Sequence, residues 1–230
     1  MEPNIAENLR SVRADIAESE RTSGRPAGSV ELLAVSKTHP SQMIREAVEA
    51  GQLLFGENRI QEAKVKIPDL PSRLRWHLIG HLQSNKVRQA LPLFEMIHGV
   101  DSVELVDDIE RIAAELGLFP RVLLQVNVAG ESSKFGFTPE RLLSDVERIA
   151  RAERIQVEGL MTIPPLASNP ENSRRYFVQL RQLRERLEKE FHLPLPQLSM
   201  GMSGDYRIAV EEGATLVRVG TAIFGGRRAK

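Results

Sequence analysis

Eight short apolar segments follow one another along the chain, and a segment with helical spacing separates most of them. The apolar segments cover residues 32–35, 53–55, 75–80, 95–101, 122–128, 157–163, 196–201 and 215–220. A short apolar run bounded by turn residues is typical of a buried strand, because a helix needs more residues. Strands that alternate with helices predict parallel strands joined by helical crossovers, as in an α/β barrel or a doubly wound sheet.

The number of strands favours the barrel, because eight is the strand number of the (β/α)8, or TIM, barrel. An extra amphipathic helix is predicted over residues 3–22, where Ile5, Leu9, Val12 and Ile16 recur at helical spacing. Little chain follows the eighth strand, so we expect this N-terminal helix to cover the gap between strands eight and one. No linker-like segment or close repeat divides the chain, and we expect residues 1–230 to form a single domain.

Composition excludes several classes of function. Lys plus Arg and Asp plus Glu both number 31, so no net charge attracts the chain to nucleic acid or to an anionic membrane. No apolar run approaches the roughly 18 residues that span a bilayer, and the N-terminus lacks the apolar segment of a secretory signal. The chain has no cysteine, which excludes disulfides, thiolate metal sites and a cysteine nucleophile. We expect a cytoplasmic protein.

The loops that follow the last two strands have the composition of an anion site. They contain Gly201-Met202-Ser203-Gly204 and Gly220-Thr221, with small residues, a hydroxyl and exposed backbone N–H groups. In (β/α)8 barrels these two loops frequently form a phosphate site. The alternative is a pair of ordinary turns with a serine capping a helix.

Two cations are predicted near the same end of the barrel. Arg218 lies within an apolar strand and must meet an acceptor if it is buried. Lys37 is predicted to end the first strand, in line with Leu33 and Val35, and strands one and eight are neighbours in a closed barrel. A lysine close to a fixed positive charge loses basicity, and a less basic amine forms a Schiff base with an aldehyde. The alternatives are a lysine that reaches into water and an arginine paired with a helix carboxylate.

Other polar residues carry weaker indications. His77 and His81 flank the end of the third strand, but no second ligand cluster supports a metal, so we interpret them as structural. Asn58 either touches a ligand or caps the following helix. Glu57 is interpreted as a solvated charge, and Lys134 as a loop lysine near the mouth of the barrel.

Five motifs, in order and at fitting spacing, resemble the pyridoxal phosphate homeostasis protein family, also called YggS/PROSC. They are AVSKTHP (34–40), FGENRIQEAKVK (55–66), WHLIGHLQSNKVR (76–88), SMGMSGDY (199–206) and VRVGTAIFG (217–225). The resemblance runs from about Lys37 to Gly225, with small departures at Arg59, Gly204 and Phe135.

The resemblance implies a barrel of the alanine-racemase type that binds pyridoxal 5′-phosphate and lacks the racemase's second, β-rich domain. By motif, Lys37 matches the lysine that forms the Schiff base, and Arg218 matches the arginine that faces the pyridine nitrogen. Asn58 matches a further pocket residue, and Lys134 a loop lysine that contacts or relays the cofactor. The phosphate cradle matches Ser203, Gly220 and Thr221, to which we add the neighbouring Gly204.

The family is viewed as a carrier or regulator of intracellular vitamin B6 without established turnover, so we expect no catalytic residue. Expected partners are the cofactor and apo-enzymes that receive it, with no nucleic acid or membrane, and a monomeric chain. The alternatives are a pyridoxal-phosphate-dependent amino-acid racemase and a phosphosugar enzyme in which Lys37 binds substrate. Racemisation needs a second acid/base, and the chain offers only Tyr176, expected in the core, and Tyr206, expected to point away.

Overall fold

The computed structural model describes residues 3–131 and 134–226, and in them eight parallel strands close into a barrel in chain order. This confirms the predicted fold class. Each strand was also expected close to its place in the sequence, although most are shorter than the apolar segments. The strands are β1 (Glu31–Val35), β2 (Leu54–Glu57), β3 (Arg75–Leu78), β4 (Met96–Val100), β5 (Arg121–Gln125), β6 (Gln156–Met161), β7 (Gln197–Ser199) and β8 (Leu216–Val219).

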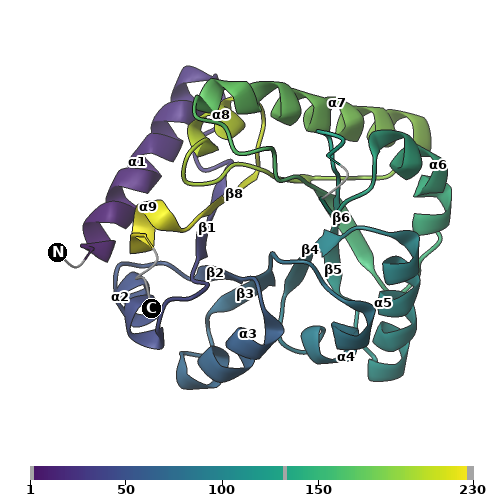
Figure 1. Ribbon diagram of the computed structural model, residues 1–230, viewed down its shortest axis with the longest axis horizontal. Helices are drawn as coiled ribbons and strands as arrows, with labels where there is room; N and C mark the ends of the chain where they lie inside the picture. The colour runs from purple at the N-terminus through teal and green to yellow at the C-terminus, as the bar shows by residue number, and fades with distance from the viewer. Residues whose placement is uncertain (1–2, 132–133, 227–230) are drawn as a thin grey trace.

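The helices form a ring outside the strands in which α2 to α8 follow one another in chain order, α1 lies between α8 and α2, and α9 lies beside α1 (Figure 1). The α-helices are α1 (Ile5–Thr22), α2 (Ser41–Glu49), α3 (Ile60–Lys66), α4 (Val87–Ala90), α5 (Val103–Leu116), α6 (Pro139–Ile149), α7 (Arg174–Phe191), α8 (Tyr206–Glu211) and α9 (Thr221–Phe224). Short 3₁₀ turns are η1 (Ile67–Asp69), η2 (Ser84–Lys86) and η3 (Pro170–Ser173). None of the helices described has the length and apolar character that crossing a membrane requires.

Local sequence signals account for where several helices begin and end. The Ser102 side chain accepts from the Leu105 N–H at the start of α5, and Gly117, at a φ of 66°, ends that helix in the left-handed region. Thr138 caps α6 in the same way, with Pro139 at the first helical position. The turn η2 begins at Ser84, and Gln83, which stands before it, makes no capping hydrogen bond with its side chain.

Helix α1 lies outside the barrel on the side of β1 and β8 (Figure 1), where it was expected, but these two strands pair directly and close the barrel themselves. It packs against α2, α8 and α9, and Figure 1 shows it beside α9 and the β1–β8 side of the barrel. Asn8 Nδ2 donates to the Ile223 carbonyl at 2.8 Å, and Arg13 Nη1 donates to the Ala50 carbonyl at 3.0 Å. Helix α1 is therefore part of the ring of helices around the barrel.

Side chains fill the inside of the barrel. Apolar residues from β1, β2, β8 and the end of β3 form one buried cluster, and residues from β4, β5 and β6 form a second. The clusters are Leu33, Val35, Leu54, Ile79 and Leu216, and Met96, Leu123 and Met161. The barrel is thus a packed core, and ligands are expected only at its open ends.

An ion-pair network holds the end of the barrel where the strands begin. Glu95 accepts from Arg75 Nε at 2.7 Å and from Arg121 Nη1 at 2.6 Å. Arg75 also pairs with Glu31, and Arg121 pairs with Glu158, so the starts of β1, β3, β4, β5 and β6 are connected. The pKa of Glu95 is lowered, chiefly by its hydrogen bonds with Arg75. The ion pairs therefore stabilise the end of the barrel where the strands begin. A functional site is expected at the opposite end, where the strands finish.

Candidate functional site

The register between β1 and β8 arranges the predicted site residues at successive levels. Arg218 lies opposite Leu33, and the backbone of Gly220 lies against Val35, where an added Cβ would be 3.2 Å from the Val35 carbonyl oxygen. Lys37 follows two residues beyond the end of β1, in a turn and half-buried. The prediction that Lys37 ends the strand is therefore wrong by two residues, but its place at the carboxyl end of β1 holds.

Arg218 is buried, with 4% of its surface exposed, and neutral groups are its hydrogen-bond acceptors. Nη1 donates to Ser199 Oγ at 2.6 Å and Nη2 to the Thr162 carbonyl at 2.8 Å. Burial lowers the pKa of Arg218 to about 10, so the side chain keeps its charge at neutral pH. The alternative of a helix carboxylate as hydrogen-bond partner is not what the structure contains. The positive charge thus has no hydrogen-bonded counter-ion in these contacts.

A hydrogen-bonded chain extends from Arg218 across the inside of the barrel. Ser199 Oγ lies 3.0 Å from His98 Nδ1, and His98 Nε2 lies 3.0 Å from His77 Nδ1. Because Ser199 accepts from Arg218, its own hydrogen is donated to His98, and His98 in turn donates to His77. Burial lowers the pKa of His77 to about 3 and the pKa of His98 well below its usual value, so both rings are neutral.

His77 is thus a structural histidine, as interpreted, although its Nε2 is buried without a hydrogen-bond partner. Across residues 3–131 and 134–226 no group of three or more His, Asp or Glu side chains is arranged to hold a metal ion. His98 and Ser199 were not among the predicted site residues. Both are buried polar residues within strands, and their place in an apolar segment is the one sequence signal that could have found them.

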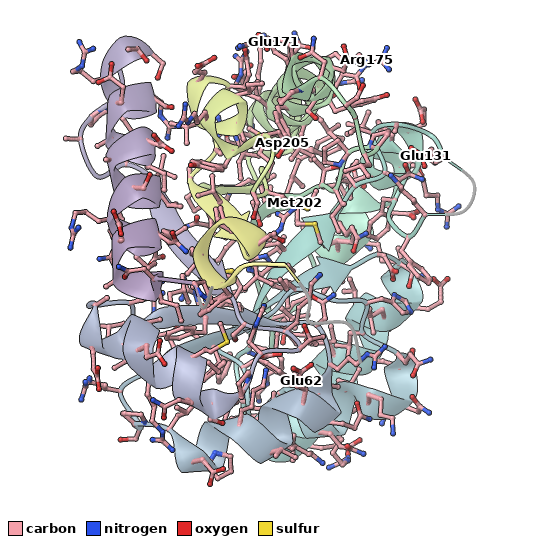
Figure 2. The ribbon with its side chains drawn as sticks, turned by 60° about the vertical axis from the view of Figure 1, so that its left-hand side comes forward. Glu62, Glu131, Glu171, Arg175, Met202 and Asp205 are labelled. Carbon is pink, nitrogen blue, oxygen red and sulfur yellow. The ribbon has the colours of Figure 1, made fainter. Side chains whose placement is uncertain are left out.

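The loops after β7 and β8 meet, as the anion-site interpretation requires. Ser203 Oγ accepts from the backbone N–H of Gly220 at 3.2 Å and of Ala222 at 3.3 Å. Figure 2 shows Met202 and Asp205 in this region, on the loop between β7 and α8. The Met202 N–H donates to Asp205 Oδ1 at 2.7 Å, which closes the loop on itself.

Two further residues of the predicted cradle, Thr221 and Gly204, are both exposed. Thr221 is the exposed first residue of α9. It lies between Gly220 and Ala222, whose N–H groups donate to Ser203. Gly204 is exposed, and a Cβ added there would meet no atom within 4 Å. The structure therefore gives no steric reason for glycine at position 204, and its contact with a ligand stays a prediction.

Glu57 is buried, with none of its surface exposed, so the interpretation as a solvated charge is wrong. Its Oε1 accepts from Ser36 Oγ at 2.7 Å and from Lys66 Nζ at 2.9 Å. Burial raises the pKa of Glu57, and the neighbouring Lys66 opposes that rise. Asn58 follows directly, half-buried, with its backbone packed against Gly80. Arg59, not Asn58, occupies the position before α3, so Asn58 is not the cap of that helix.

The loop that follows β5 contacts the loop that follows β3. The ring of Phe135 stacks on His81 with centroids 3.8 Å apart, and His81 Nδ1 lies 2.9 Å from Asp101 Oδ2. Lys134, the loop lysine, is half-buried and pairs with Glu131 at 3.2 Å. Sequence reasoning missed the pairing of His81 with Asp101, because the two residues follow different strands.

Comparison with known proteins places the chain in a family. Residues 5–228 match the family model for the alanine racemase N-terminal domain. A protein of Aquifex aeolicus named pyridoxal phosphate homeostasis protein is 43% identical over 226 residues, covering 98% of this chain and 99% of the relative. A human protein of the same name is 40% identical, covering 95% and 85%. The chain belongs to this family.

Solved structures agree with that assignment. PipY of Synechococcus elongatus is 43% identical and covers 96% of this chain and 100% of its own, with a TM-score of 0.87 without pyridoxal phosphate. The structure of PipY with pyridoxal phosphate bound gives a TM-score of 0.84. An alanine racemase of Clostridium difficile is 17% identical with a TM-score of 0.74, and 58% of its length is covered. That last likeness concerns the fold alone.

Proposed function

We propose that this chain binds pyridoxal 5′-phosphate and acts in the homeostasis of that cofactor. The observation that carries the proposal is the arrangement of three kinds of group at the carboxyl ends of β1, β7 and β8. These are the amine-bearing Lys37, the buried cation Arg218 and the Ser203–Gly220 contact. The cofactor carries an aldehyde, a pyridine nitrogen and a phosphate, which an amine, a hydrogen-bond donor and an anion cradle complement.

The donor groups of the cradle suit a phosphate. Ser203 Oγ accepts two backbone hydrogens, so its own hydrogen is available for a phosphate oxygen. Gly220 lies close against Val35, where a side chain would force a neighbour to give way. Glycine there lets the loop after β8 pack closely against the end of β1, with its N–H held by Ser203. We propose Ser203, Gly220 and Thr221 as the phosphate-binding residues, with Gly204 and Asn58 at the edge of the pocket.

Arg218 is proposed to face the pyridine nitrogen. Its hydrogen bonds to Ser199 and Thr162 use two of the five guanidinium hydrogens. An arginine cannot give its proton to the ring, so it donates a hydrogen bond and leaves the ring nitrogen unprotonated. When bound, the cofactor supplies an electron-withdrawing ring, and an unprotonated ring withdraws electrons less strongly than a protonated one.

Lys37 is proposed to hold the cofactor covalently. Its amine nitrogen bonds to the aldehyde carbon, the carbon–oxygen double bond is lost, and one water molecule leaves. The names of the Aquifex and human relatives and the PipY structure with pyridoxal phosphate bound support the assignment of the cofactor. We further propose that apo-enzymes which use this cofactor receive it, because a reversible covalent link allows both capture and release.

We also propose that the chain does not turn over amino acids at a biological rate. Racemisation of an amino acid needs an acid/base on each face of the ring. Both tyrosines of the chain are engaged elsewhere: Tyr206 donates to Asp15 Oδ2 of α1 at 2.6 Å, and Tyr176 accepts from Arg175 Nη2 at 2.6 Å. Tyr176 is half-exposed, so the expectation that it lies in the core is wrong. Burial raises the pKa of Tyr206 to about 12, so its phenol stays protonated at neutral pH and is a weak proton donor.

The direct test is a spectroscopic titration of the purified chain with pyridoxal 5′-phosphate. Wild-type protein is expected to turn yellow as the Schiff base forms. Lys37→Ala is expected to lose the yellow band while keeping its folded far-ultraviolet spectrum, and Lys134→Ala serves as the matched control that retains the band. Retention of the full band in Lys37→Ala would overturn the assignment of Lys37.

A further inference from the structure

Three charged side chains outside the proposed cofactor contacts hold the segment that carries Lys37. Glu57 is the last residue of β2, and Glu62 and Lys66 lie one turn apart on α3. Figure 2 shows Glu62 low in the view, whereas Glu171 of η3 and Arg175 of α7 lie at the top. We call these three residues the Glu57–Glu62–Lys66 cluster.

Lys66 is the centre of the cluster. Its Nζ donates to Glu57 Oε1 at 2.9 Å, to Glu62 Oε1 at 2.6 Å and to the Ser36 backbone carbonyl at 2.8 Å. An ammonium group has three hydrogens to donate, so these contacts use all of them. One of the three bonds reaches the residue immediately before Lys37.

Both neighbours of Lys37 in the chain are bound by the cluster. Before it, Ser36 Oγ donates to Glu57 Oε1 at 2.7 Å, in addition to the bond from Lys66 to the Ser36 carbonyl. After it, the backbone N–H of Thr38 donates to Glu62 Oε1 at 2.5 Å. The backbone on each side of Lys37 is therefore tied to β2 and α3.

Thr38 needs such a tie, because its backbone is strained. Its φ of 67° lies in the left-handed region, which a β-branched residue rarely adopts. Among residues 3–131 and 134–226, only Thr38 and His192 are non-glycine residues with positive φ. Strain of this kind persists where the surroundings enforce it, and it is common at functional sites. The Thr38 bond to Glu62 supplies that enforcement directly after Lys37.

Stability alone is a poor reason for the cluster. Glu57 is fully buried and Lys66 has 8% of its side chain exposed. Removing two charges from water carries a large desolvation penalty, and a well-packed apolar pair often stabilises a fold as much or more. Glu57 Oε2 is, in addition, buried without a hydrogen-bond partner. An ionic cluster in this position is explained better by what it orients.

We propose that Glu57, Glu62 and Lys66 are positioning residues that set the direction in which Lys37 leaves the backbone, and thereby its capture of the cofactor's aldehyde. This rests on the proposed function. In the capture step the Lys37 nitrogen bonds to the aldehyde carbon, the carbonyl oxygen leaves as water, and nothing is oxidised or reduced. Holding the amine in place beforehand lowers the entropy lost in that step, so the cluster favours capture without touching the cofactor.

The test separates covalent capture from non-covalent binding. Pyridoxine 5′-phosphate has the same ring and phosphate but an alcohol in place of the aldehyde, so it measures non-covalent binding alone. The ratio of its dissociation constant to that of pyridoxal 5′-phosphate measures the gain from capture. Lys66→Met removes all three bonds at nearly constant length. Lys64→Met is the matched control, since Lys64 lies exposed on the same helix and its Nζ donates to Gln89 Oε1 at 2.9 Å, outside the cluster.

Lys66→Met is expected to lower the ratio about tenfold or more, with the binding of pyridoxine 5′-phosphate within about twofold of wild type. It is also expected to shift the pH midpoint of the yellow band, which a merely structural role would not do. Lys64→Met is expected to match wild type in both. Lys66→Arg, which restores a donor and the charge, is expected to recover part of the ratio.

A wild-type ratio and pH midpoint in folded Lys66→Met would overturn the inference while leaving the proposed function intact. If Lys66→Met fails to fold, Glu62→Gln replaces it, because Glu62 is the more exposed member and its change weakens only the tie to Thr38 and Lys66. The ratio is then expected to fall by about threefold, and an unchanged ratio would again overturn the inference. A wild-type protein with no preference for the aldehyde, or an unaltered ratio in Lys37→Ala, would instead remove the proposed function on which the inference rests.

Discussion

Arg218 and Ser199 are joined by a hydrogen bond of 2.6 Å inside the barrel, so a buried cation is held by a neutral hydroxyl. The Thr162 carbonyl, also neutral, accepts the second bond at 2.8 Å. A carboxylate would satisfy Arg218 more fully, but it would also compete with a ligand for the charge. The neutral acceptors fix the guanidinium group of Arg218 without neutralising its charge, which stays available to a ligand at the open end of the barrel.

Replacement of Ser199 by alanine should therefore destabilise the chain. The change removes one acceptor from Arg218 and the donor to His98. Loss of a buried partner of this kind reduces the free energy of unfolding by about 1–3 kcal/mol. Urea denaturation measures the loss, with Ser144→Ala on exposed α6 as the control that changes little. A Ser199→Ala protein as stable as wild type would show that the hydrogen bonds of Ser199 contribute little to the free energy of unfolding.

The two buried histidines make stability depend on pH. The folded pKa of His77 is lowered to about 3 and that of His98 is also lowered, whereas an unfolded histidine titrates near 6.5. Below about pH 6.5 these histidines take up protons in the unfolded chain but stay neutral in the folded chain. Their contribution to the free energy of unfolding is therefore complete above that pH and is lost as the pH falls toward 3. Each histidine contributes a slope of up to about 1.4 kcal/mol per pH unit.

The check is the free energy of unfolding between pH 5 and 7, where carboxylates contribute little. His77→Asn should be less stable at pH 7 but should show a flatter dependence than wild type. His192→Asn is the control, because His192 is exposed and asparagine tolerates its left-handed φ of 53°. A slope that His77→Asn leaves unchanged would contradict the neutral, buried state of that ring.

The fold could be predicted because eight short, mostly apolar segments alternate with helical ones, as expected of parallel strands that are buried on both faces. The need of Arg218 for an acceptor was also predictable, because its place within β8 implies burial. The identity of its acceptors was not, since Ser199 and the Thr162 carbonyl lie 19 and 56 residues from Arg218 and come from other strand ends.

Glu57 illustrates the same limit at shorter range. In the sequence it resembles any charged residue at the end of a strand and before a helix. Its burial depends on Lys66 returning from α3 to cover it, and on Ser36 of the neighbouring strand end. Neither the local pattern nor the charge of residue 57 contains that information. The family resemblance assigns roles to Lys37 and to the phosphate cradle because they match motifs. It assigns no role to the Glu57–Glu62–Lys66 cluster.

The phosphate cradle predicts a specific loss of selectivity. Ser203→Ala combined with Thr221→Val removes both hydroxyls at the loops after β7 and β8. Each hydrogen bond to a charged group contributes about 1.5–3 kcal/mol, so the double variant should bind pyridoxal 5′-phosphate more weakly by a few kcal/mol at most. Pyridoxal without phosphate should then bind nearly as well as the phosphorylated form. If the double variant still strongly prefers the phosphorylated form, the backbone N–H groups carry the selectivity instead.

Slow proton exchange without inversion is expected of amino acids incubated with the cofactor-loaded chain. Lys37 serves one face, and the missing general acid on the other face lowers the rate by about 10² to 10⁴. Chiral analysis of alanine and serine, with Lys37→Ala as the control, measures inversion. Lys37-dependent inversion at about one turnover per second or faster, within the usual range of enzymes, would support the racemase alternative. Tyr206 would then be the first residue to replace.

The central claim is that Lys37 binds the cofactor covalently. Borohydride reduction of wild-type protein loaded with pyridoxal 5′-phosphate makes the link permanent, and peptide mapping then locates the label. The account predicts a stable label on the peptide that contains Lys37, and no such label in Lys37→Ala. A label found wholly on Lys134 in the native protein would contradict it.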